Sequence, residues 1–168
     1  MGEEAPDAPP RIPTQNDLIS VCRSLNEHGA RYLVVGGFAI IHHGCVRATD
    51  DIDLLVEESI ENQARVKAAL TVLPEKAILE LGDDDLRNYV VVRVADEVMV
   101  DLMLAACGIK FDEALPEVRV VTIKGVPIPF ASPKLLLRMK QTHRAKDAED
   151  RIFLHQRIAE EEEKEGSE

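Results

Sequence analysis

Arg47-Ala-Thr-Asp-Asp-Ile-Asp-Leu-Leu-Val56 is the stretch in which polar sequence gives way to apolar sequence, and it predicts a β-strand over residues 51–56. Because alternate side chains of a strand share a face, Asp51 and Asp53 are expected to point the same way, while Ile52 and Leu54 point into a core. Two converging carboxylates repel each other unless a cation lies between them, and their hard oxygens suit Mg²⁺ or Mn²⁺. A solvated acidic pair at the start of a strand is the alternative.

A third carboxylate strengthens the metal interpretation. Asp101 lies within Val98-Met-Val-Asp-Leu-Met-Leu104, which is otherwise apolar. A lone ionised carboxylate is costly to bury in such a strand, and a metal shared with the first two carboxylates would offset that cost. The alternative is an edge strand on which Asp101 faces water. We therefore expect Asp51, Asp53 and Asp101 to be both metal ligands and catalytic residues in metal-assisted phosphoryl or nucleotidyl transfer.

A glycine pair upstream offers a place for phosphate. Gly36-Gly37 follows the apolar run Tyr32-Leu-Val-Val35 and precedes a helical turn at Phe38-Ala-Ile-Ile41. Exposed backbone N–H groups at such a junction can hold a phosphate group. Taken alone, the pair is also compatible with a plain turn.

Taken together, these motifs resemble the nucleotidyltransferase superfamily with the DNA polymerase β-like catalytic fold. They are the run Gly36-Gly-Phe-Ala-Ile-Ile-His-His-Gly44, the stretch from Arg47 to Asp53, and Asp101 on a later strand. The pattern is similar to the aminoglycoside-nucleotidyltransferase and the abortive-infection or toxin–antitoxin branches. The segment from Leu137 to Asp150 also resembles a helical segment of such small bacterial proteins. The resemblance covers about residues 30–155.

The resemblance implies a fold, a reaction and residue roles. The fold would be α+β, with a mixed β-sheet flanked by helices and with C-terminal helices. The reaction would move an NMP from an NTP to a hydroxyl acceptor and release pyrophosphate. Asp51 and Asp53 would hold two divalent ions, and Asp101 would bind the activating ion and act as general base. The residues expected to bind the NTP co-substrate are Gly36, Gly37, Arg47, Thr49, Lys140, Arg144 and Lys146.

Several alternatives stay open at this point. A loop ion pair for Arg47, a strand cap for Thr49 and solvated helix positions for the basic residues would explain them without a ligand. Asp147 and Asp150 are expected to pair with the basic helix residues rather than to bind metal. The second loop residue is Gly37, where many relatives carry Ser. The roles of His42 and His43 are unassigned. The chain also has no room for the large helical domain that shapes the acceptor pocket in relatives, so the last helices, a protein partner or a second copy of the chain would complete that pocket.

The hydrophobic pattern divides the chain into three parts. We expect a disordered arm over residues 1–13, a single domain over residues 14–157 with a C-terminal helical segment at 132–157, and an acidic tail over 158–168. Helices are expected at 14–28, 59–73, 111–115, 133–142 and from 146 to the tail. Strands are expected at 32–35, 51–56, 89–94, 98–104, 119–123 and 128–130.

Composition limits the classes of function. The net charge of -11 makes extended nucleic acid an unsuitable partner, although residues 134–157 carry a local excess of positive charge. No signal peptide and no apolar run long enough to span a membrane is visible, and the three cysteines have no metal-binding spacing, so we expect a cytoplasmic protein with reduced thiols. Two other hypotheses remain: a non-catalytic partner protein of the same fold, such as one component of a toxin–antitoxin pair, and a sugar-nucleotide glycosyltransferase.

Overall fold

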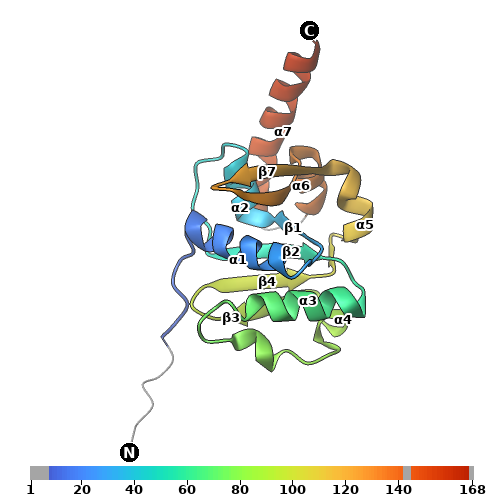
Figure 1. Ribbon diagram of the computed structural model, residues 1–168. Helices are drawn as coiled ribbons and strands as arrows, with labels where there is room; N and C mark the ends of the chain where they lie inside the picture. The colour runs from blue at the N-terminus through green and yellow to red at the C-terminus, as the bar shows by residue number, and fades with distance from the viewer. Residues whose placement is uncertain (1–7, 142–144, 167–168) are drawn as a thin grey trace, which may run out of the picture.

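A six-stranded mixed sheet organises the computed structural model, which describes residues 8–141 and 145–166 (Figure 1). The strand order is β3-β4-β2-β1-β8-β7. β2 runs parallel to β4, β1 runs parallel to β8, and the remaining pairs are antiparallel. The expected α+β class with a mixed sheet is therefore confirmed. The strands are β1 (Tyr32–Val35), β2 (Asp51–Val56), β3 (Val92–Ala95), β4 (Met99–Met103), β7 (Val118–Ile123) and β8 (Val126–Ala131), and a separate hairpin consists of β5 (Ala105–Ala106) and β6 (Ile109–Lys110).

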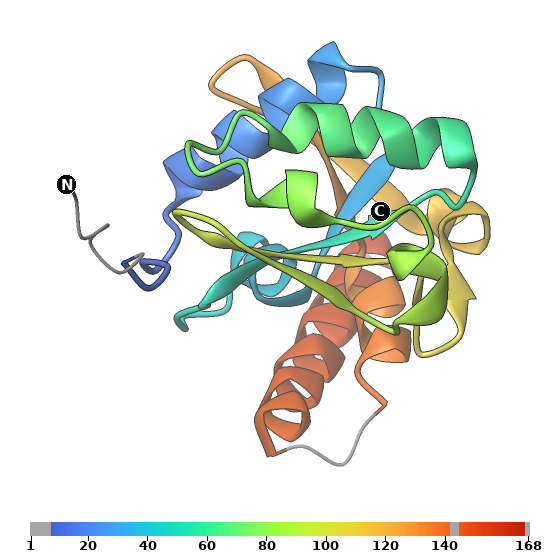
Figure 2. The ribbon, with the colours of Figure 1, turned by 90° about the horizontal axis from the view of Figure 1, so that it is seen from below.

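Helices cover both faces of the sheet. Figure 2 shows α1 and α3 on one side, and α6 and α7 on the other, where α2 contacts α6. The end of α7 projects away from the sheet (Figure 1). The main helices are α1 (Gln15–Glu27), α2 (Gly36–His42), α3 (Ile60–Leu70), α6 (Pro133–Met139) and α7 (Ala145–Gly166), and the short ones are η1 (Ala77–Glu80), α4 (Asp85–Asn88), α5 (Phe111–Ala114) and η2 (Leu115–Glu117).

Polar side chains start three of the main helices where the sequence predicted a start. The Thr14 hydroxyl and the Asp17 carboxylate form a capping box at α1. The Ser59 and Ser132 hydroxyls accept hydrogen bonds from backbone N–H groups in the first turns of α3 and α6. These bonds satisfy N–H groups that have no partner within the helix, so they fix where each helix begins.

The central strands form the core. Ile52, Leu54, Leu55 and Val56 of β2 are fully buried, and β1 is buried along its whole length. β4 lies between β3 and β2, so Asp101 is on an interior strand rather than on an edge strand. The interior position predicted for this carboxylate is confirmed.

The structure differs from the expected secondary structure in several stretches, among them the unexpected short helices η1 and α4. Residues 89–91 precede β3 instead of belonging to it, and the ladder with β4 begins only at Val92, which pairs with Leu102. Residues 105–110 form the β5-β6 hairpin, which hydrophobic periodicity did not predict. Its turn includes Cys107 and Gly108, both with positive φ.

Contacts with the domain and helix are seen at the two ends of the described chain. The backbone N–H of Arg11 donates to the carbonyl oxygen of Glu97, and its guanidinium pairs with Asp17. Residues 158–166 of the acidic tail continue α7 as helix. No helix in the described part of the chain combines the length and the apolar character that crossing a bilayer requires.

Candidate active site

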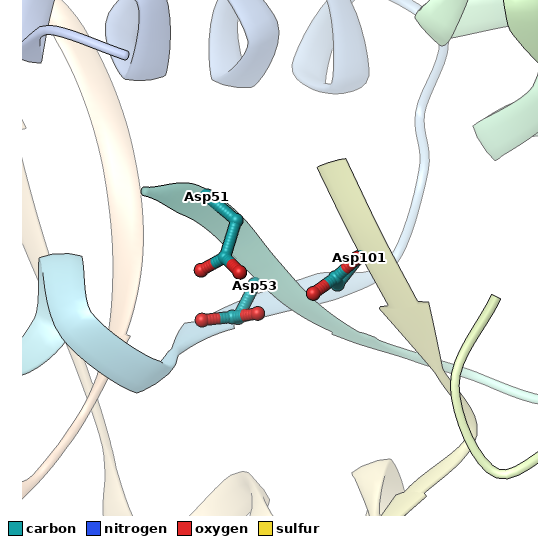
Figure 3. A group of neighbouring side chains, drawn as sticks. All are labelled: Asp51, Asp53 and Asp101. Atoms are coloured by element: carbon teal, nitrogen blue, oxygen red, sulfur yellow. The ribbon is translucent and has the colours of Figure 1, made fainter. Parts of the chain in front are cut away.

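Three carboxylates converge where β2 and β4 lie side by side (Figure 3). In the parallel register, Asp53 is the direct partner of Asp101, and Asp51 lies two residues earlier on the same face of β2. One oxygen from each carboxylate lies within 4.8 Å of the other two. Asp101 is buried, and the other two are partly buried. The cluster is therefore consistent with a divalent metal site made of oxygen ligands.

Burial and mutual repulsion raise the pKa of two of these acids. For Asp53 the pKa rises to about 8, first because of burial and then because of the negative charges of Asp51 and Asp101. Burial and the charge of Asp101 also raise the pKa of Asp51. Like charges at this spacing disfavour full ionisation, so the cluster needs a nearby cation to carry its whole negative charge.

A cation of the protein itself contacts the cluster, and no sequence pattern indicated this contact. Arg93 of β3 donates from Nε to Oδ1 of Asp101 at 2.9 Å and from Nη2 to Oδ2 of Asp101 at 3.0 Å. The same Nη2 lies 3.3 Å from Oδ2 of Asp51. These contacts raise the pKa of Arg93, and they follow from the cross-strand pairing of Arg93 with Asp101.

The glycine pair lies directly against the site. Gly36 has a φ of 68°, and a methyl group there would overlap Oδ2 of Asp53 and lie 2.7 Å from its Cγ. A Cβ at Gly37 would lie 2.7 Å from Cβ of Thr49 and 3.3 Å from Nη2 of Arg47. Glycine is therefore required at position 36 by both conformation and space, and at position 37 by space. The Thr49 side chain fills the volume that a Ser at position 37 would need.

Two basic candidates from the sequence, Arg47 and Lys140, are held by aspartates of α7. Nζ of Lys140 lies 3.1 Å from Oδ1 of Asp147 and 3.4 Å from Oδ2 of Asp150. Nε of Arg47 lies 3.1 Å from Oδ1 of Asp150. Both aspartates are almost fully buried, so this cluster joins the start of α7 to the loop before β2.

A cavity of about 570 Å³ contains the three carboxylates. Gly36, Gly37, Arg47, Thr49, Arg93 and Lys140 line it as well. The apolar part of its wall includes Val90, Val91, Met103, Leu136 and Met139. The sequence did not predict this apolar wall, because the residues before β3, the end of β4 and helix α6 come together only in the tertiary fold.

The two histidines of the glycine run do not line this cavity. His42 stacks on Phe130, and Nε2 of His43 bonds to the carbonyl oxygen of Ala131; neither ring lines the cavity. Arg144 and the side chain of Lys146 lie outside the described residues. Cys22, Cys45 and Cys107 are free thiols.

The comparisons with known proteins agree with this geometry. A family model described as "nucleotidyl transferase of unknown function (DUF2204)" matches residues 14–166. The structure of ANT(2″)-Ia in complex with adenylyl-2″-tobramycin is similar with a TM-score of 0.54 and 14% identity, over 86% of this chain and 89% of that one. A nucleotidyltransferase candidate from Thermotoga maritima matches 70% of this chain and 76% of its own, with 16% identity and a TM-score of 0.47. No curated protein sequence matches the chain.

Proposed function

We propose a reaction for this chain, which belongs to the family of nucleotidyl transferases of unknown function (DUF2204): the transfer of an NMP from an NTP to a hydroxyl group. Pyrophosphate is the second product. The acceptor hydroxyl belongs to a small molecule, a protein or an RNA end. The observation that carries the proposal is the convergence of three carboxylates from two parallel strands inside a cavity that the glycine pair also lines.

The donor set fits Mg²⁺ or Mn²⁺. It offers only carboxylate oxygens, which are hard ligands, and no thiolate or imidazole that would favour zinc. The raised pKa of Asp53 supports the same conclusion, because a buried acid with two acidic neighbours gains most from a divalent cation. Asp51, Asp53 and Asp101 would hold the metal, and its chemistry there would be to neutralise phosphate charge and to acidify the acceptor hydroxyl.

The chain's own residues position the nucleotide. Gly36 and Gly37 open α2, whose N-cap residue Val35 makes no side-chain bond to the first turn. Their N–H groups are available to phosphate oxygens, and the cations of Arg47 and Lys140 line the same cavity. The Thr49 hydroxyl, which donates to the carbonyl oxygen of Asp51, would have to exchange that bond to reach a phosphate. Asp147 and Asp150 hold these two cations in place, which limits the entropy lost when phosphate binds.

The acceptor oxygen approaches from the side of Asp101. Each Asp101 oxygen accepts one hydrogen bond from Arg93 and keeps a further lone pair for a metal or for the hydroxyl proton. We assign the apolar wall at Val90 and Val91 to contacts with the acceptor body or the base. A protein partner or a second copy of the chain would extend this wall.

A label-transfer experiment tests the proposal. The protein is incubated with α-labelled ATP, CTP, GTP or UTP, Mg²⁺ and cell extract, and the labelled product is then identified. We expect label on a discrete acceptor with the wild-type protein and none with Asp51→Asn. Asp50→Asn is the matched control, because Asp50 is adjacent in sequence but does not line the cavity. Lack of transfer from all four nucleotides, or equal transfer by Asp51→Asn, contradicts the proposal.

A further inference from the structure

Arg93 makes more contacts with the carboxylate cluster than a surface ion pair requires. Its Nε and Nη2 engage both oxygens of Asp101 in a bidentate arrangement, and Nη2 also reaches Oδ2 of Asp51 at 3.3 Å. Fork-shaped pairing of this kind is among the stronger charge-assisted interactions. The guanidinium therefore binds two of the three acids that the proposed function assigns to metal.

The position of Arg93 in the sheet fixes this arrangement. β3 is the outermost strand next to β4, and its register places Arg93 directly opposite Asp101. The side chain is 59% exposed and lies between two cavities, the one of about 570 Å³ and a second of about 300 Å³ lined by Arg11, Asp50 and Met99. The guanidinium is thus held at one end by carboxylates and can still move into solvent.

The positive charge of Arg93 affects how strongly the carboxylate cluster can bind a metal ion. With all three acids ionised the cluster carries three negative charges, and the guanidinium cancels one of them. A divalent ion bound to the same oxygens would be repelled by the guanidinium. It would also share the oxygens with the hydrogen bonds of Arg93 or displace those bonds. An arriving triphosphate adds negative charge beside the guanidinium and restores the attraction for metal.

We propose that Arg93 is the resident counter-cation of the carboxylate cluster, a positioning residue that weakens divalent metal binding until the nucleotide arrives. The proposal rests on the proposed function, since it takes the cluster as the metal site. Under this proposal, the carboxylate cluster binds a divalent metal ion tightly only when the nucleotide is present. Arg93 is not required as a ligand or as an acid or base.

Titration of Mn²⁺ by calorimetry, without nucleotide, tests this role. Arg93→Gln removes the charge, and we expect it to bind Mn²⁺ at least tenfold more tightly than the wild type, because a unit charge about 4 Å from a divalent ion has an effect of this size even in a water-like medium. Arg93→Lys keeps the charge and should stay within about threefold of the wild type. Arg93→Met, which keeps the aliphatic stem, should behave like Arg93→Gln and replaces it if that variant does not fold.

Arg119→Gln is the matched control. Arg119 lies on β7, the opposite edge strand, and its half-exposed side chain makes a bidentate pair with Glu161 that does not touch the cluster. Its loss should leave Mn²⁺ affinity within about twofold of the wild type, because screening removes distant charge effects.

The outcomes separate this role from the proposed function. If the wild type binds Mn²⁺ and the neutral Arg93 variants bind it no more tightly, Arg93 is not a counter-cation, and the proposed function stands. If Arg93→Lys tightens binding as much as Arg93→Gln, geometry rather than charge is responsible, and the proposal is wrong. If no variant binds Mn²⁺, the metal site on which both proposals depend is refuted.

Discussion

Replacing Gly36 by Ala tests how closely the glycine loop approaches the carboxylate cluster. At this position the backbone φ is 68°, and an added methyl group would overlap Oδ2 of Asp53 and lie 2.7 Å from its Cγ and 2.9 Å from its Cβ. Two costs therefore add: the left-handed backbone conformation and the collision with Asp53. We expect Gly36→Ala to disturb both the stability of the fold and the placement of one metal-binding carboxylate.

Gly29 separates the two costs. It has a nearly equal φ of 66°, but a Cβ there would meet only Nη1 of Arg65 at 4.0 Å. The conformational cost for an alanine is about 1–2 kcal/mol in either place. Overpacking adds about 1–3 kcal/mol. Gly29→Ala should therefore destabilise the fold by about 1–2 kcal/mol and Gly36→Ala by about 2–5 kcal/mol.

Urea denaturation measures the free energy of unfolding of both alanine variants. The effect of Gly36→Ala is also measured in a protein that already carries Asp53→Ala. Asp53→Ala removes the two Asp53 atoms nearest to the new methyl group, so Gly36→Ala should cost less in that background than in the wild type. If Gly36→Ala and Gly29→Ala destabilise the wild type equally, within about 0.5 kcal/mol, the close approach of Gly36 to Asp53 is refuted.

Three further predictions concern Asp96, Asp53 and Gly37. Asp96 is buried and accepts hydrogen bonds from the N–H groups of Glu75, Ala77 and Glu97, so Asp96→Ala should lower the free energy of unfolding by about 3 kcal/mol in urea denaturation. Asp85→Ala, which loses one exposed bond, should lower it by under about 1 kcal/mol, and equal losses would contradict the role of Asp96. Because the pKa of Asp53 is raised to about 8, the folded protein keeps a proton that the unfolded chain releases, so metal-free stability should fall as pH rises from about 4 to about 8. The increase in Tm on adding Mg²⁺ should accordingly be larger at about pH 9 than at about pH 6, and equal increases would refute this linkage. Gly37→Ser should destabilise the fold by about 1–3 kcal/mol through contact with Thr49, and Thr49→Gly should recover part of that loss in thermal denaturation; no recovery would mean that the two residues do not compete for space.

The carboxylate cluster could be predicted because its evidence is local. The alternation around Asp51 and Asp53 fixes their common face, and the apolar neighbours of Asp101 indicate an interior strand. The helix starts at Thr14, Ser59 and Ser132 were predictable for the same reason, because each cap acts within one turn.

Arg93 could not be assigned because its role depends on a hairpin register. The strands expected at 89–94 and 98–104 leave residues 95–97 as the turn between them, which would place Arg93 opposite Met99. In the structure the turn comprises residues 96–98, and Ala95 pairs with Met99. Arg93 is therefore paired with Asp101 instead of Met99. A shift of two residues keeps the side chain on the same face and leaves the hydrophobic pattern unchanged, so periodicity could not detect it.

The apolar wall was missed because it depends on where a strand ladder ends. Val90 and Val91 have the composition of a strand, but the ladder between β3 and β4 begins only at Val92, and both residues line the cavity. Asp147 and Asp150 were expected to pair with the basic residues of their segment, and their contacts with Lys140 confirm this. Their burial and the contact of Asp150 with Arg47 could not be predicted, because both depend on how α7 packs in the fold.

The most direct test of the central claim is a comparison of α-labelled and γ-labelled nucleotide with the wild-type protein and with Asp53→Asn. A nucleotidyl-transfer site at Asp51, Asp53 and Asp101 predicts that the α-label moves to the acceptor, that the γ-label leaves in pyrophosphate, and that Asp53→Asn abolishes both. Transfer of the γ-label to an acceptor, or unchanged transfer by Asp53→Asn, would contradict the account.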